Sequence, residues 1–84
     1  MNVEEIHRQI GENIRLLRTY YGMSRKTPAM LIKMPVNRLR RVEAGDPTAK
    51  IYDFHLHRVA RVFDVTIDAL TEELELPRGS DWAV

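Results

Sequence analysis

Residues 23–45, "MSRKTPAMLIKMPVNRLRRVEAG", are the most informative part of the chain, because they hold two short amphipathic segments in close succession. The spacing of apolar residues predicts one helix that ends before Pro35 and a second over about 35–44, with Leu39 and Val42 turned inward. Proline at the first turn of the second helix costs no hydrogen bond, because that N–H would have no helical partner anyway. The second segment is basic, so it is either part of a nucleic-acid reader or a solvated face of a helical core.

The start of the first of these helices has two readings. If Ser24 caps the helix, Pro28 is its fourth residue and removes the first helical hydrogen bond. If Thr27 is the cap, Pro28 becomes the first helical residue, which is a favoured pairing. Arg25 and Lys26 would then lie in the preceding loop, and the helix would be little more than one turn. Both readings stay open on sequence alone.

The flanking sequence predicts three further helices. Residues 3–20 carry one apolar stripe at helical spacing, and Gly22 provides a stop. A helix over about 51–63 follows, and Thr66 can cap a short fifth helix that runs through Leu74. No segment of useful length alternates apolar and polar residues, so the chain is expected to be all-α. The residues expected to face inward in these helices are Ile6, Ile10, Ile14, Leu17, Leu56, Val59, Ala60, Phe63, Ile67 and Leu70.

Length and composition bound the class of protein. Eighty-four residues make one small domain, expected over residues 1–76, followed by a tail over 77–84. The letters "LPRGS" at 76–80 resemble the remnant of an engineered protease site, so no function is assigned to them. With no cysteine, there is no disulfide framework and no thiolate metal site. No apolar run is long enough to cross a membrane, and the acidic, amphipathic start is unlike a signal peptide, so a cytoplasmic protein is expected.

Charge is distributed unevenly along the chain, although the net charge is only +1. Residues 25–61 hold nine Lys or Arg and three acids, a net charge of +6, whereas residues 62–84 carry a net charge of −5. A basic middle beside an acidic end is typical of an electrostatic footprint for phosphate groups. The alternative is that both are solvated surfaces of a small helical domain.

Signals for an enzyme or a metal site are weak. The sequence has no glycine-rich phosphate loop, metalloprotease helix or nucleophile elbow, so no enzymatic activity and no cofactor are expected. His55 and His57 stand two apart on a predicted helix and point to different faces, which makes a poor chelate. No metal is expected.

The spacing within residues 23–45 is the most specific signal. Arg25, Ala29, Lys33, Leu39 and Val42 fall at positions 1, 5, 9, 15 and 18 of a twenty-residue window. Position 5 needs a small residue where two helices cross, and the last two positions need aliphatic residues that hold the second helix on the core. This is the helix-turn-helix arrangement, in which the second helix enters the major groove.

The sequence on either side fits the same pattern. With "IGENIRLLRTYYGMS" before the window and "VARVFDVTIDAL" after it, residues 10 to 74 resemble the phage-repressor or XRE-type (Cro-like) helix-turn-helix family. The resemblance implies a five-helix, lambda-repressor-like domain that binds double-stranded DNA. In that family the residue at position 9 is usually glycine, because the turn visits the left-handed region. Lys33 there would cost about 1–2 kcal/mol.

The resemblance also assigns roles to residues by position. Asn37, Arg38 and Arg41 would read or position on bases, since Asn pairs with adenine and Arg with guanine, and Val36 could contact a thymine methyl. An arginine near the end of the first helix often pairs with a glutamate at the end of the third, which implies a partly buried ion pair between Arg18 and Glu43. The residues expected to neutralise phosphate are Arg25, Lys26, Lys33, Arg40 and Lys50.

The expected function is therefore sequence-specific DNA binding by a transcriptional regulator, a repressor in the simplest case. A homodimer through the C-terminal helix would place two recognition helices about 34 Å apart. Leu74, Leu76 and Trp82 form either that dimer seam or a disordered tail. The competing reading is a helix-turn-helix-derived module that binds a protein partner, regulatory or antitoxin-like, with weak or no DNA binding.

Overall fold

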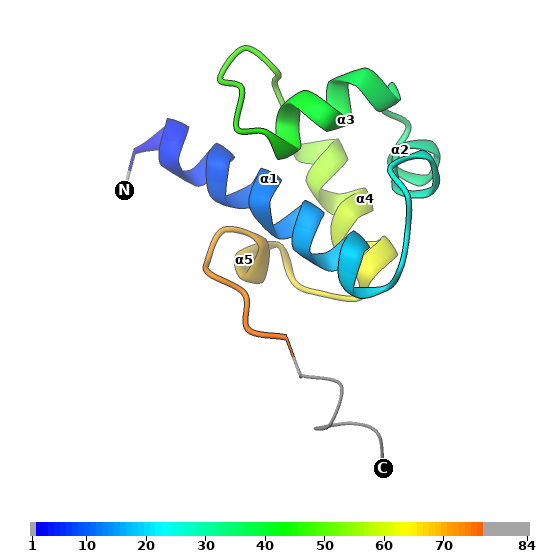
Figure 1. The fold of residues 1–84 in the computed structure, drawn as a ribbon. Coiled ribbons are helices and arrows are strands. Elements are labelled where there is room, and N and C mark those ends of the chain that lie inside the picture. The colour runs from blue at the N-terminus through cyan, green and yellow to red at the C-terminus, as the bar shows by residue number, and fades with distance from the viewer. Residues whose placement is uncertain (1, 77–84) are drawn as a thin grey trace.

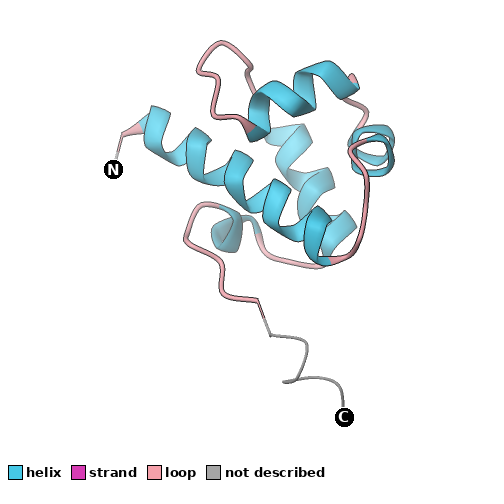
Figure 2. Cartoon of the chain, in the orientation of Figure 1, coloured by secondary structure: helices cyan, strands magenta, loops and turns pink. Residues whose placement is uncertain are grey.

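The computed structural model describes residues 2–76, which form five helices and no strand (Figures 1 and 2). The predicted all-α class is confirmed for this part of the chain. The predicted tail at 77–84, with Trp82, lies outside the described residues. The helices are α1 (Val3–Tyr20), α2 (Lys26–Ile32), α3 (Val36–Glu43), α4 (Asp53–Phe63) and α5 (Ile67–Leu70).

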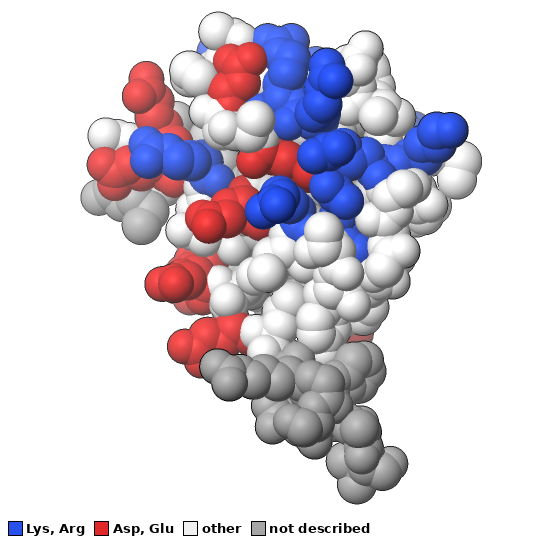
Figure 3. All heavy atoms as spheres, viewed as in Figure 1, with Lys and Arg blue, Asp and Glu red and all other residues white. Residues whose placement is uncertain are grey.

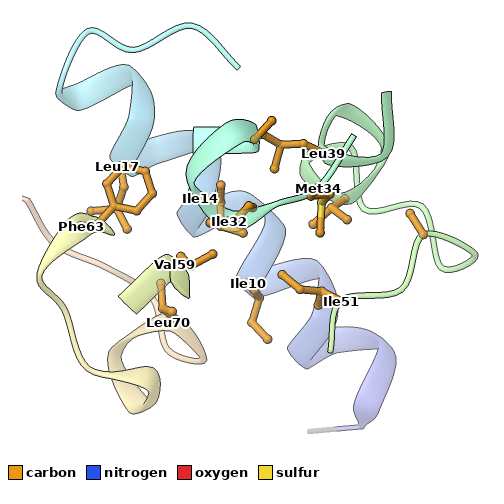
Figure 4. Packing of buried hydrophobic residues seen from close by; sticks show 13 residues of the cluster. Ile10, Ile14, Leu17, Ile32, Met34, Leu39, Ile51, Val59, Phe63 and Leu70 are labelled. Atoms are coloured by element: carbon orange, nitrogen blue, oxygen red, sulfur yellow. The ribbon is translucent and has the colours of Figure 1, made fainter. Parts of the chain in front are cut away.

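The helices surround one apolar core. In Figure 1, α1 crosses the front of the molecule with α3 above it and α2 beside α3, while α4 lies behind. α1 packs against α3 and α5, and α2 packs against α3 and α4. Three core residues come from connecting segments, Met34 before α3, and Ala49 and Ile51 before α4. Figure 4 labels Met34 and Ile51 within the cluster. The buried apolar residues are Ile10, Ile14, Leu17, Ala29, Ile32, Met34, Leu39, Val42, Ala49, Ile51, Val59, Phe63 and Leu70.

Helix α1 has the bounds that its apolar stripe predicts. The side chain of Asn2 caps it by accepting a hydrogen bond from the backbone N–H of Glu5 at 2.9 Å. Gly22, with φ of +70°, turns the chain away after its last turn. Gly11 lies where α1 meets α3, and a Cβ added there would stand only 2.0 Å from the carbonyl oxygen of Val42. The close approach of the two helices therefore requires glycine at this position.

Helix α2 differs from both readings of the sequence. It begins at Lys26, and Arg25 is its N-cap without a side-chain hydrogen bond, so neither Ser24 nor Thr27 caps it. Pro28 is the third helical residue, where an N–H has no helical partner in any case. The first helical bond is donated by Ala29 to the carbonyl of Arg25 at 3.0 Å. The proline therefore removes no hydrogen bond.

The turn between α2 and α3 has the expected conformation. Lys33 is left-handed, with φ of 58° and ψ of 52°. The backbone N–H of Met34 then bonds the carbonyl of Ala29 at 2.9 Å, which closes the end of α2. Pro35 is the N-cap of α3 rather than its first residue, and Gly45, with φ of +79°, follows its last turn.

Helices α4 and α5 are shorter than expected. α4 begins at Asp53, after the backbone N–H of Tyr52 donates to Nδ1 of buried His55 at 3.0 Å. Thr66 caps α5 as predicted, with its Oγ1 accepting from the backbone N–H of Ala69 at 3.1 Å. The helix ends at Leu70 instead of continuing to Leu74.

The early end of α5 has a physical cause in α1. The Nδ2 group of buried Asn13 donates to the carbonyls of Leu70 and Glu72, each at 2.7 Å, so these carbonyls need no further helical turn. Leu74 and Leu76 then pack half-buried against the core. Leu74 and Leu76 are therefore part of the packed domain rather than of a disordered tail, and a dimer seam through them stays a prediction.

Candidate nucleic-acid interface

A buried ion pair fixes α3 on α1. Glu43 accepts hydrogen bonds from Nε of Arg18 at 2.6 Å and from its Nη2 at 2.8 Å, and the Glu43 side chain is 1% exposed. The hydrogen bond to Glu43 raises the pKa of Arg18, against the opposing effect of burial. The ion pair expected between these residues is thus present, and it is bidentate and more deeply buried than expected.

Arg25 belongs to the same cluster. Its Nε lies 3.0 Å from Oε1 of Glu43, and its side chain is 37% exposed. One carboxylate therefore accepts from two arginines. Arg25 was expected only to contact phosphate, whereas in the structure its Nε already donates to Glu43.

Helix α3 has two distinct faces. Leu39, Val42 and Glu43 are buried, so they hold the helix on the core. The opposite face is exposed and carries Val36, Asn37, Arg40 and Arg41. These positions are one and four residues apart, so they form one continuous polar surface on the helix.

Arg38 lies beside this surface and is held by the segment that leads to α4. Its Nε donates to the carbonyl oxygen of Lys50 at 2.9 Å, and its Nη2 donates to the same oxygen. Its guanidinium also lies over the ring of Tyr52, 5.5 Å from the centroid. No residue pattern predicts this contact, because a backbone carbonyl can be supplied by any residue type.

Arg41 is held by the turn after α3. Its Nε lies 2.9 Å from Oδ2 of Asp46, and its Nη2 donates to Oγ1 of Thr48. Both the backbone N–H and the hydroxyl of Thr48 donate to Oδ1 of Asp46. Hydrogen bonds from Thr48 and Arg41 lower the pKa of Asp46 to about 2, so the carboxylate stays charged at neutral pH. The letters "DPT" are typical of such a side-chain turn and could have predicted it.

The remaining expected residues are available to a ligand. Within residues 2–76, no hydrogen bond, ion pair or cation–π contact involves the side chains of Lys26, Lys33, Asn37, Arg40 or Lys50, and all five are exposed. They come from α2, the turn after it, α3 and the segment before α4. Figure 3 shows Lys and Arg gathered over the end of the molecule where α2 and α3 lie, with most Asp and Glu elsewhere on this face.

An apolar surface lies on α2 and α4. Met30 is 70% exposed, Leu31 47% and Phe54 50%. Arg58 connects the two helices, because its Nη1 donates to the carbonyl of Ile32 at 3.4 Å and its guanidinium lies 5.2 Å from the Phe54 centroid. Exposed apolar side chains of this size on neighbouring helices are typical of surfaces that contact other molecules.

The histidines are not brought into a metal site. His55 is buried and accepts from the backbone of Tyr52, whereas His57 is exposed. Residues 2–76 contain no group of three or more side chains suited to hold a metal ion. In the same residues, no helix combines the length and apolar character needed to span a membrane.

Comparisons of the chain with protein-family models, with curated proteins and with solved structures find no match. What this surface binds therefore has to be inferred from its geometry and charge.

Proposed function

We propose that the protein binds double-stranded DNA, with α2 and α3 acting as a helix-turn-helix and α3 lying in the major groove. The observation that carries the proposal is the exposed polar face of α3, which presents Asn37, Arg40 and Arg41 on a helix whose opposite face is buried. An α-helix fits the major groove, and these side-chain types match its hydrogen-bonding groups.

Base contacts would come from three polar residues and one apolar residue. The amide of Asn37 has no partner in the described part of the protein and can pair with adenine. Arg38 and Arg41 each use Nε and Nη2 inside the protein, which leaves Nη1 and the second hydrogen of Nη2 for the two acceptors of guanine. Val36 would contribute contact with a thymine methyl.

Phosphate contacts would surround this helix. Lys26, Lys33, Arg40 and Lys50 are exposed and would neutralise the backbone on either side of the groove. Arg25 would contribute less than its position in the sequence suggests, because Glu43 holds its Nε.

Sequence-specific binding at a promoter would make the protein a transcriptional regulator, with repression by occupancy as the simplest outcome. A homodimer formed near the C-terminal helix would read two half-sites one helical turn apart, about 34 Å. The short α5, and the burial of Leu74 and Leu76 on their own core, leave less apolar surface for such a contact than the sequence suggested.

A titration of isotope-labelled protein with mixed-sequence duplex DNA at low salt tests the proposal. Backbone amide shifts that cluster at residues 25–41 and reverse with added salt are expected. Binding through several phosphates weakens by orders of magnitude between roughly 50 and 200 mM salt. A folded protein that shows no shifts at low salt would rule out DNA binding.

A second candidate is favoured by the exposed apolar residues of α2 and α4. Met30, Leu31 and Phe54 would bury against a protein partner, and the fold would then serve as an interaction module. Such binding would persist at high salt and would be lost in Met30→Ser, whereas DNA binding would be retained in that variant.

A further inference from the structure

The segment between α3 and α4 makes organised contacts with the arginines of α3. Residues 44–52 form a loop that leaves the end of α3 and returns to the core at Ile51 (Figure 1). Within it, the backbone N–H of Asp46 donates to the carbonyl of Arg41 at 3.0 Å. The side chain of Asp46 then bonds both Arg41 and Thr48, so the loop and the arginine fix one another.

Both arginines are held in the same way. A guanidinium has two edges that present a pair of parallel N–H groups, one formed by Nε and Nη2 and the other by Nη1 and Nη2. Arg38 turns its Nε–Nη2 edge to the carbonyl of Lys50, and Arg41 turns the same edge to Asp46 and Thr48. In each case the edge formed by the two Nη groups has no partner within residues 2–76.

The stacking of rings beside Arg38 strengthens its restraint. Tyr52 lies against the guanidinium on one side, and its ring stacks on Phe54 with centroids 6.0 Å apart. The guanidinium of Arg58 lies over the ring of Phe54, and its Nη1 donates to the carbonyl of Ile32 at the end of α2. The position of Arg38 is therefore tied to α2 as well as to α4.

From these contacts we propose that Asp46, Thr48 and Tyr52 are positioning residues that set the sequence discrimination of the DNA site. They hold the Nε–Nη2 edges of Arg41 and Arg38, so both side chains are already in one rotamer before DNA binds. Their remaining edges can then donate to guanine without reordering. An unrestrained arginine loses side-chain entropy on binding, and it can adapt its position to other bases. A restrained arginine has lost that entropy already, and it fits only the base that matches its fixed position. This inference rests on the proposed function.

Thr48→Val tests the proposal without changing charge. Valine removes the hydroxyl that accepts from Arg41 and donates to Asp46, while the ion pair of Arg41 with Asp46 remains. The matched control is Thr19→Val on α1, where the hydroxyl bonds only the backbone of its own helix. Wild-type protein selects a duplex from a random library, and each variant is then titrated with that duplex and with a scrambled duplex of equal composition.

The expected result is a loss of preference, not of general affinity. Thr48→Val should bind the selected duplex about tenfold more weakly than wild type, within the range of one base contact. Binding to the scrambled duplex and the melting temperature should stay at the wild-type values, and Thr19→Val should match wild type in all three measurements.

Asp46→Asn is a second test of the positioning role. It removes a negative charge beside the groove, so binding to the scrambled duplex should become tighter while the preference for the selected duplex falls. Asp68→Asn, which makes the same charge change at an exposed position on α5, should leave the preference unchanged.

Failure of the two proposals would look different. If wild type binds no duplex in preference to another, sequence-specific DNA binding is wrong and the positioning role falls with it. The other case is that wild type prefers the selected duplex over the scrambled one. If Thr48→Val and Asp46→Asn then keep the same preference as wild type, the loop only stabilises the fold and the positioning role is wrong.

Discussion

At the scale of single residues, Glu43 carries more than one role in the fold. Its carboxylate accepts from Arg18 on α1 and from Arg25 at the start of α2, and it is itself part of α3. Three helices therefore meet at one buried charge. Removal of the carboxylate would leave the charge of Arg18 buried without a counter-ion, with only the carbonyl of Met23 still accepting from its Nη1. Removing one partner of a buried ion pair destabilises a protein strongly, because the other charge stays buried.

Glu43→Ala should accordingly lower the free energy of unfolding by about 3–5 kcal/mol. Urea denaturation followed by circular dichroism measures this loss. Asp46→Ala, which removes a partly exposed carboxylate paired with one arginine, is the control and should destabilise the protein much less than Glu43→Ala. A melting temperature for Glu43→Ala within a degree of wild type would contradict the structural role of the pair.

His55 gives the protein a dependence of stability on pH. Burial, together with nearby Arg38 and Arg58, lowers the pKa of His55 below its ordinary value of 6.5. The unfolded chain then binds more protons than the folded one as the pH falls below 6.5. The stabilisation is complete above that pH and is lost as the pH drops toward the folded-state pKa.

The melting temperature of wild type should therefore fall between pH 7.5 and pH 5.5. In His55→Asn, whose side-chain oxygen can still accept from Tyr52, this fall should be smaller. His57→Asn, at an exposed position two residues along, should keep the wild-type pH dependence. Equal pH dependence in His55→Asn and wild type would mean that another group is responsible.

At the scale of elements, the crossing of α1 and α3 depends on Gly11. A methyl group there would meet the backbone of Val42, which cannot move without shifting α3. Gly11→Ala should destabilise the protein by about 3 kcal/mol, although alanine favours helix. Gly22→Ala, with no atom within 4 Å but a positive φ, should cost only about 1–2 kcal/mol. Thermal unfolding of both variants measures the difference. Equal losses of stability would mean that α3 shifts and accommodates the added methyl group.

The turn between α2 and α3 stores strain at Lys33. A glycine there would relieve the left-handed conformation, so Lys33→Gly should raise the free energy of unfolding by about 1 kcal/mol. Lys33→Ala keeps the strain and should leave stability unchanged. Both variants remove one charge, so both should weaken DNA binding equally. Chemical denaturation separates them, and a Lys33→Gly protein no more stable than Lys33→Ala would contradict the expected strain.

The elements also show where sequence reasoning succeeds. The bounds of α1 follow from a long apolar stripe with a glycine stop, and the buried face of α3 follows from Leu39 and Val42. The start of α2 could not be found from a capping residue, because no side chain caps it. The end of α5 was misplaced because Leu74 continues the spacing of Leu70, while the bonds that end the helix come from α1.

In the candidate site too, some features follow from the pattern of residues and others depend on contacts with other segments. The exposed residues of α3 could be predicted, since they follow from the helical period once the buried face is known. The restraint on Arg38 could not, because its acceptor is a backbone carbonyl in a segment that folds back on α3. For Arg41, the letters "DPT" indicate the turn of Asp46 and Thr48, but not that this turn bonds the arginine. Contacts between neighbouring elements through the backbone leave no pattern of residue types.

For the whole molecule, the separation of charge predicts how the proposed binding to DNA responds to salt. Loss of one phosphate contact should reduce the slope of log affinity against log salt by about 0.9. Arg40→Ala should show this reduction in fluorescence-anisotropy titrations with a labelled duplex. Arg15→Ala, an exposed arginine on α1 away from α3, should keep the wild-type slope. Equal slopes in the two variants would place the phosphate contacts elsewhere.

The bonds of Asn13 also bear on how the chain is made. The carbonyls that this amide requires belong to Leu70 and Glu72, 57 and 59 residues further along. While the ribosome is still adding α4, the amide of Asn13 lacks these two acceptors and must stay hydrated, so it cannot yet be buried without cost. We therefore expect the buried position of Asn13, and with it the packing of α1 on α5, to form only after residue 72 has emerged.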